Sequence, residues 1–238
     1  MKKFSEYINE SNNNLFVYKS IYKNNNKIDK FIKYAIKEMS DNNVKIRFLD
    51  KKFIHYKDNE KSIGYFSYNN YPEFICAIGN DIDEWFPIFV HEFCHYRQWV
   101  EKSKYWNILY DNVKGKKVDV SSLMDDWITG KEFSKNKIKE YVKRTLECER
   151  DCEKRTVKMI KDFDLPIKID KYIRGANSYL YFYIYVLKRR VWYKEIPPYK
   201  IKKVLELMPN DKILDNHDDI SNKIISIFDK YYGNKEKK

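Results

Sequence analysis

The feature that most constrains this chain is a heavily apolar segment, residues 84–102, whose few polar side chains include His91, Glu92 and His95. Its length and its many aromatic residues predict a buried helix of about five turns. Residues four apart lie one above the other on a helix, so His91 and His95 share one face. Two imidazole nitrogens on one face can reach the same metal ion at about 2 Å. Glu92 lies one step round the helix, where it can accept a proton from a water at that ion.

The start of this helix is predicted from three residues. Asp83 is the expected N-cap, Glu84 suits the first turn, and Pro87 fits only near a helix start. The alternative to a metal site is a pair of core or partly exposed histidines beside a solvated glutamate.

A catalytic zinc ion needs a third protein ligand and one open position. Apolar periodicity predicts a second helix over residues 137–163. Glu149 occupies a position on the buried stripe of this helix where an apolar residue is expected, and Glu153 follows one turn later. The other members of the predicted stripe are Ile138, Val142, Thr145, Cys152, Thr156, Met159 and Phe163. A buried carboxylate is costly unless it is paired or binds a metal. We therefore expect Glu149 to be the third ligand, and Glu153 to hold a ligand histidine in its tautomer.

Two alternatives to the assignment of Glu149 as the third ligand remain open. Glu149 and Glu153 can pair with a lysine or arginine at the edge of the core. Alternatively, Cys148 and Cys152 complete a closed structural site with the two histidines. Because the cysteines are rotated by about 100° from the glutamates, one helix is not expected to present both pairs equally.

The two motifs together resemble a known superfamily. They are His91-Glu92-Phe93-Cys94-His95 and Glu149-Arg150-Asp151-Cys152-Glu153. Over residues 44–163 the chain resembles the zincin metallopeptidases whose third ligand is a glutamate, and it is most similar to small cytosolic ImmA/IrrE-like and SprT-like peptidases. The resemblance implies that Glu149 completes the zinc site, and that Glu153 supports a histidine.

The expected fold class is α+β and zincin-like, with a small three-stranded sheet, the active-site helix that carries the HExxH motif, and a helical C-terminal half. The strands are predicted near 44–48, 63–68 and 74–78, after a helix from Ile28 to Met39. An irregular connection with short helical pieces is predicted over 103–136, and further helices over 170–193, 199–208 and 218–231. We expect a single domain over 1–238, with an α/β part at about 1–102 and a helical part at about 137–232.

Two further functional features are expected. A strand near 73–79 is predicted to pair with an extended substrate by strand addition. Tyr179 and Tyr183 share one face of the 170–193 helix and are candidates for stabilising an oxyanion. The alternative for either tyrosine is ordinary aromatic packing.

Charge and composition limit the partners and the cellular compartment that we expect for this protein. The formal net charge is +12, which attracts nucleic acid or acidic partners, but the lysines are spread along the chain without a recognisable nucleic-acid motif. The start of the chain lacks the apolar run of a secretion signal, and the run from Tyr179 to Leu187 is too short to cross a membrane. The four cysteines show no disulfide spacing. These observations predict a cytoplasmic protein that does not associate with membranes.

The expected activity is zinc-dependent hydrolysis of peptide bonds, with Zn²⁺ as the cofactor, Glu92 as the residue that activates the water, and a protein or peptide as the substrate. The alternative is a non-enzymatic, basic module that is stabilised by zinc and binds nucleic acid or a partner protein.

Overall fold

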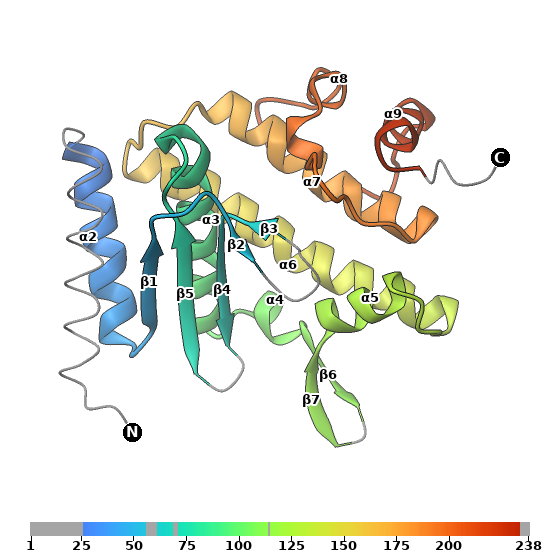
Figure 1. Ribbon diagram of the computed structural model, residues 1–238, viewed down its shortest axis with the longest axis horizontal. Helices are drawn as coiled ribbons and strands as arrows, with labels where there is room; N and C mark the ends of the chain where they lie inside the picture. Colours follow the sequence, from blue (N-terminus) through green and yellow to red (C-terminus); the bar gives the residue numbers. More distant parts are fainter. Residues whose placement is uncertain (1–25, 56–60, 69–70, 114, 234–238) are drawn as a thin grey trace. The chain divides into compact units, whose positions relative to one another are not determined.

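The protein is an α+β structure made of two compact units (Figure 1). The computed structural model describes residues 26–55, 61–68, 71–113 and 115–233. The first unit is the described part of Met1–Glu101 together with Lys158–Ile167, and the second is the described part of Lys102–Val157 and Lys168–Lys238. The start of the chain, from which the absence of a secretion signal was predicted, lies outside the described residues.

The first unit contains a mixed three-stranded sheet between helices α2 (Asn26–Asp41) and α3 (Ile82–Val100) in the chain. Its strands are β1 (Lys45–Leu49), β4 (Gly64–Tyr68) and β5 (Pro72–Ala77), in the spatial order β1-β5-β4. β5 runs parallel to β1 and antiparallel to β4. The predicted helix and three strands are thus confirmed, in the predicted order.

The central position of β5 contradicts the expectation that a substrate strand pairs with residues 73–79. In the described sheet both sides of β5 are already hydrogen-bonded, since Phe74 lies opposite Ile46 on one side and Phe66 on the other. The sequence pattern marks these residues as a strand but does not say which strands flank it. The edge strands of the described sheet are β1 and β4.

A second, two-stranded ribbon was not predicted. It pairs β2 (Ile54–His55) with β3 (Lys61–Ser62). Each strand has only two residues, so neither is long enough to show a period of two. Ile54 packs on Ile75 and Ala77, on the face of the main sheet that is turned away from α3. We call this the outer face.

The core of the first unit is a cluster of aromatic rings between α3 and the sheet. The Phe89 ring centroid lies 5.1 Å from that of Phe74, 5.8 Å from that of Phe48 and 6.2 Å from that of Phe31 on α2. These four side chains are buried. The cluster joins both helices to one face of the sheet.

The predicted N-cap of α3 is wrong by one half-turn. The N-cap is Asp81, whose side chain makes no capping hydrogen bond, and the helix begins at Ile82. Asp83 therefore lies with Glu84 in the first turn, where negative charge interacts favourably with the helix dipole.

Helix α6 (Lys135–Asp162) runs through both units and agrees closely with the prediction over 137–163. Cys152 and Thr156 are fully buried, as the predicted stripe requires. The stripe fails at its end, because Phe163 is 38% exposed. Its ring nevertheless packs 5.1 Å from Phe31 within the first unit.

The second unit begins with α4 (Lys104–Asn107), a hairpin of β6 (Tyr110–Val113) and β7 (Lys116–Asp119), and α5 (Val120–Ile128). The short helices α4 and α5 agree with the short helical pieces expected over 103–136, whereas the hairpin was not expected. Its strands alternate little between apolar and polar residues, so periodicity does not reveal them.

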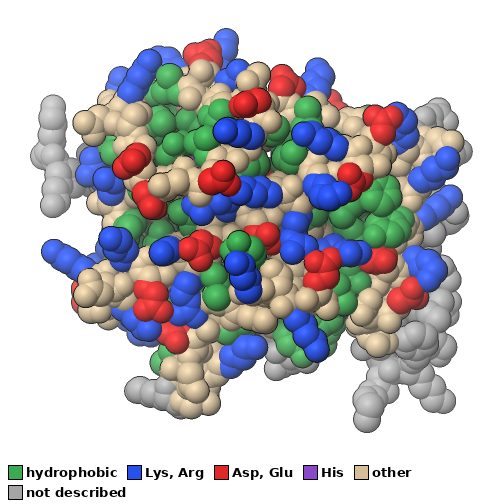
Figure 2. Space-filling view, turned by 180° about the vertical axis from the view of Figure 1, so that it is seen from behind, with side chains coloured by type: hydrophobic (Ala, Val, Ile, Leu, Met, Phe, Trp, Pro, Cys, Tyr) green, Lys and Arg blue, Asp and Glu red, His purple; other side chains and the backbone are tan. Residues whose placement is uncertain are grey.

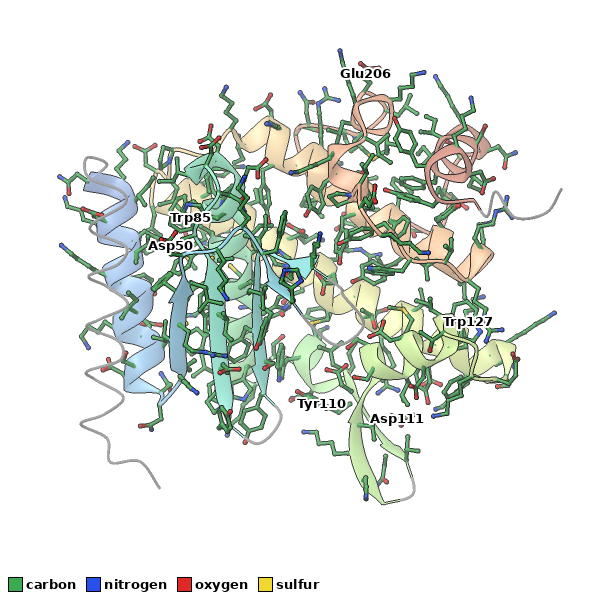
Figure 3. The ribbon with its side chains drawn as sticks, in the orientation of Figure 1. Asp50, Trp85, Tyr110, Asp111, Trp127 and Glu206 are labelled. Carbon is green, nitrogen blue, oxygen red and sulfur yellow. The ribbon has the colours of Figure 1, made fainter. Side chains whose placement is uncertain are left out.

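Contacts to α6 hold the hairpin in place. Asp111, labelled in Figure 3, accepts a hydrogen bond from the Tyr141 hydroxyl (3.0 Å) and pairs with Lys137 (3.1 Å). Arg144 donates to the carbonyls of Ile108 and Tyr110, both at 2.6 Å.

The rest of the second unit is helical. It contains α7 (Ile169–Arg189), the 3₁₀ turn η2 (Pro198–Lys200), α8 (Lys202–Leu205) and α9 (Asn222–Tyr232), which correspond to the three predicted C-terminal helices. None of the helices in the described part of the chain combines the length and the apolar character needed to cross a membrane.

His217 is fully buried in the second unit as a neutral imidazole. Its Nε2 lies 3.1 Å from Asn177 Oδ1, and its Nδ1 accepts a 3.4 Å hydrogen bond from Arg150 Nε. Burial, followed by the charges of Arg150 and Lys154, lowers the pKa of His217 to about 3. A proton on Nδ1 would face the Arg150 donor, so protonation of His217 is unfavourable in the folded chain.

We predict that His217 makes the fold weaker in mild acid. The unfolded chain protonates this residue near its ordinary pKa of 6.5, whereas the folded chain does so only near pH 3, so stability is lost as the pH falls through this window. Between pH 7 and pH 5 the loss attributable to His217 is about 2 kcal/mol. Urea unfolding of wild type and His217→Gln at the two pH values measures it.

The exposed His55 supplies the matched control for this prediction. His55→Gln should keep the pH dependence of wild type, and His217→Gln should flatten it even though that variant starts from a lower stability. Equal losses in wild type and His217→Gln would contradict the role of His217.

Candidate metal centre

The two motif histidines lie together on α3. Their ring centroids are 4.8 Å apart and the rings are nearly perpendicular, at 86°. His95 is buried and His91 is half-buried. The four-residue spacing on a regular helix brings them together, as the sequence predicts.

The orientation of His95 is set by a residue that the sequence analysis missed. His95 Nδ1 lies 2.9 Å from Oε1 of Gln98, a side chain that is completely buried. With Nδ1–H donating to this amide, the lone pair of the ring is on Nε2, which is then available for a metal. The available signal was the position of Gln98, an uncharged polar residue in an apolar helix three places after a histidine.

Glu92 is held at the edge of the sheet. Its Oε2 accepts a 2.9 Å hydrogen bond from the backbone N–H of Phe66 in β4. Ala77 N donates to Ile63 O (2.6 Å), and because neighbouring residues of an antiparallel pair alternate in direction, Phe66 N–H points away from β5. The carboxylate therefore lies beside the outward edge of β4.

Gly64 leaves the space that the Glu92 side chain occupies. A Cβ on Gly64 would lie 3.4 Å from Glu92 Cγ and 3.2 Å from Ile88 Cγ2, so a larger residue there presses on the helix. The charge of Glu92 also reaches Cys76 on the same face of the sheet. Burial first, and this charge second, raise the pKa of the Cys76 thiol well above its ordinary value.

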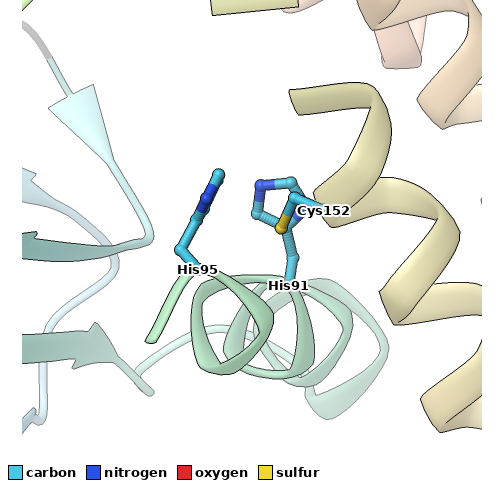
Figure 4. Close-up of side chains that lie close together, drawn as sticks. All are labelled: His91, His95 and Cys152. Carbon is cyan, nitrogen blue, oxygen red and sulfur yellow. The ribbon is translucent and has the colours of Figure 1, made fainter. Parts of the chain in front are cut away.

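Cys152 of α6 completes a group of three potential ligands (Figure 4). One ligand atom each from His91, His95 and Cys152 lie within 4.8 Å of one another. Two imidazoles and a thiolate are a donor set that zinc accepts. The group can therefore bind a metal ion.

Glu149, the ligand expected from the sequence, is half-buried and does not belong to this group. Three residues of helix turn the chain by about 300°, so Cys152 lies only about 60° from Glu149. The rotation that separates Cys148 from Glu149 thus does not apply to Cys152. Glu149 contributes, after burial and the charges of Tyr183 and Tyr193, to raising the pKa of Tyr179. Its role as a ligand stays a prediction.

The remaining predicted site residues have partners of their own in the second unit. Glu153 is buried and accepts a 2.5 Å hydrogen bond from the Tyr172 hydroxyl. The hydroxyls of Tyr179 and Tyr183 are 3.3 Å apart and their rings pack edge to face. The histidine-supporting role of Glu153 and the oxyanion role of either tyrosine stay predictions.

Comparisons with known proteins found no relative of this chain. The chain matches no model of a protein family, no curated protein and no solved structure. Any functional conclusion therefore depends on the chemistry of the site itself.

We predict that the purified protein binds about one zinc ion per chain, and that His91→Ala and His95→Ala each abolish binding because two ligands seldom retain zinc. Cys152→Ser should weaken binding by more than the roughly 10–100-fold cost of losing a supporting residue. Competition with a chromophoric chelator measures these affinities.

Cys148→Ser is the matched control, since Cys148 is also a fully buried cysteine of α6 but lies outside the group. It should keep the zinc affinity of wild type. If Glu149→Ala loses zinc while Cys152→Ser keeps it, the third ligand is Glu149, as the sequence indicates. Absence of zinc from wild type prepared without chelator would exclude the site.

We also predict that Gln98→Met, which keeps the size of the side chain but removes the amide, lowers zinc affinity roughly 10–100-fold. The reason is the loss of the acceptor that fixes His95. The same chelator competition is the measurement, and circular dichroism checks that the fold is retained. An unchanged affinity would show that His95 needs no support from Gln98.

Proposed function

We propose that this protein is a zinc-dependent peptidase of the zincin type. His91, His95 and one residue of α6 hold Zn²⁺, and Glu92 is the general base. The observation that supports the proposal best is the position of Glu92, whose carboxylate follows the first ligand in the chain and lies at the edge of β4. A site that only stabilises the fold does not need a carboxylate in this position.

The chemistry of such a site follows from its residues. When bound, zinc lowers the pKa of water towards neutrality and polarises a carbonyl. Glu92 accepts a proton from the attacking water and later donates it to the leaving amine. Phe66 N–H orients one carboxylate oxygen, which leaves the other oxygen of Glu92 for this proton.

We propose a protein or peptide as the substrate. A peptide in extended form can add to the edge of a sheet through its main chain, and the strand that lies at the edge beside Glu92 is β4. This replaces the earlier expectation that residues 73–79 fulfil this role. The four cysteines are buried and form no disulfide, which is typical of a reducing compartment, so we propose a cytoplasmic location.

One observation favours a second candidate function. Cys152 beside two histidines is also a donor set of structural zinc sites, and the chain is basic. A zinc-stabilised module that binds nucleic acid or a partner protein is therefore the alternative. On the face shown in Figure 2, basic and acidic side chains are interspersed, so that face offers no continuous basic patch.

We predict that Glu92→Gln keeps zinc but loses hydrolysis, because the amide has nearly the same shape yet cannot accept the proton. The expected loss in rate is on the order of 10²–10⁴. Wild type and variant are incubated with unfolded casein and a mixed peptide library, and cleavage is followed by mass spectrometry. Zinc content is measured on the same samples.

Glu84→Gln is the control, because Glu84 is an acidic residue in the first turn of the same helix. It should hydrolyse peptides at the wild-type rate. A Glu92→Gln protein with bound zinc and wild-type turnover would remove Glu92 from the mechanism. Zinc binding by wild type without any cleavage would favour the structural alternative.

A further inference from the structure

The outer face of the sheet contains a cavity of about 320 Å³. Because side chains alternate along a strand, Arg47, Tyr65 and Ile75 form one row across β1, β5 and β4 on this face. Glu92 contacts β4 on the opposite face, at Gly64 and at Phe66. The cavity is therefore separate from the candidate metal centre, and all of its lining residues belong to the first unit.

The cavity has an apolar floor. Leu49 and Ile75 of the sheet and Ile54 of the β2–β3 ribbon line it, and they belong to one cluster of packed apolar side chains. Phe53 also lines the cavity and is 38% exposed, so an aromatic ring is available to a bound molecule. The volume is at the lower end of the range for small-molecule sites, about 300–1,000 Å³.

The charged groups of the cavity are cationic. Arg47 and Lys51 line it, together with the polar side chains of His55 and Tyr65, and none of the described residues that line it is acidic. Asp50, labelled in Figure 3, precedes Lys51 in the chain but is not part of the lining.

The acidic residue next to the cavity is already engaged. Glu73 accepts from the Tyr65 hydroxyl at 3.0 Å, and its other oxygen lies 3.1 Å from Arg47 Nη2 and 3.8 Å from Lys45 Nζ. Three donors therefore share this one carboxylate. Among the described residues, the cavity lining holds two cations, Arg47 and Lys51, and Glu73 is shared by Arg47 and Lys45.

Arg47 is only partly satisfied by these contacts. Its Nε is buried without a hydrogen-bond partner among the described residues, while the side chain as a whole is 40% exposed. A guanidinium pairs best with an oxyanion through two parallel N–H bonds. An anion in the cavity would supply acceptors that the protein itself does not.

We propose that this cavity binds a small organic anion. The carboxylate or phosphate group of the ligand pairs with Arg47 and Lys51, and its apolar body, about the size of one ring, lies against the floor. The combination of cations with an apolar floor distinguishes this site from a general basic surface, which attracts any anion without contacting its body. The proposal is independent of zinc and of peptide hydrolysis.

The test is a titration of the full-length protein, stripped of metal by a chelator, followed by NMR of backbone amides. The probes are phenyl phosphate, phenylacetate, inorganic phosphate and benzyl alcohol. We expect one of the two aromatic anions to bind saturably, with a dissociation constant of about 1 mM or tighter. The amides that shift should be those of β1, β5 and residues 51–55. The aromatic anion that binds more tightly identifies the preferred charged group. Inorganic phosphate lacks the ring and benzyl alcohol lacks the charge, so each should bind about tenfold more weakly than that anion, or weaker still.

Variants assign the binding to the cavity. Arg47→Gln should weaken binding at least about tenfold, and Lys51→Gln, an exposed change that spares the fold, roughly threefold. Lys33→Gln, which removes one charge from the exposed face of α2, should bind like wild type. The proposal is overturned if neither aromatic anion saturates below about 20 mM, if the shifts centre on His91 and His95, or if Lys51→Gln and Lys33→Gln weaken binding equally.

Discussion

The direction of every functional side chain on α3 depends on how that helix packs against the sheet. Phe89 lies among Phe48 and Phe74, and Phe93 packs 5.7 Å from Phe31. Each aromatic ring buries roughly 150–250 Å², so turning the helix about its axis would expose several of them. The rotation of α3 is thereby set, and with it the directions in which Glu92 and His95 point.

Within this apolar packing the polar atoms of the site are satisfied one by one. The Glu92 carboxylate accepts a hydrogen bond from the outward N–H of Phe66, and His95 Nδ1 is hydrogen-bonded to the amide oxygen of Gln98. Buried polar groups are costly when they lack partners, so these bonds keep the site polar without destabilising the helix. In the proposed mechanism, the second carboxylate oxygen of Glu92 and Nε2 of His95 are the atoms that take part in the chemistry.

Some of the basic side chains have a structural role in the second unit. Arg144 binds the carbonyls of Ile108 and Tyr110, Arg174 binds those of Leu205 and Met208, and Arg190 binds that of Trp127. Arginine has five donors in a planar fork and is suited to holding loop carbonyls. The charges of these three arginines therefore serve the fold and need no nucleic acid to account for them.

Sequence alone determined the parts of this protein that depend on local spacing. The four-residue interval places His91 and His95 on one face, and apolar periodicity predicts α3 and α6 to within a few residues, because both depend only on helix geometry. Tertiary structure decided what depends on contacts between distant segments. It made β5 a central strand, and it added Cys152 to the residues that can hold a metal with the two histidines. A pattern along one helix defines a face to within about 60°, and only packing decides which side chain of that face meets its neighbours.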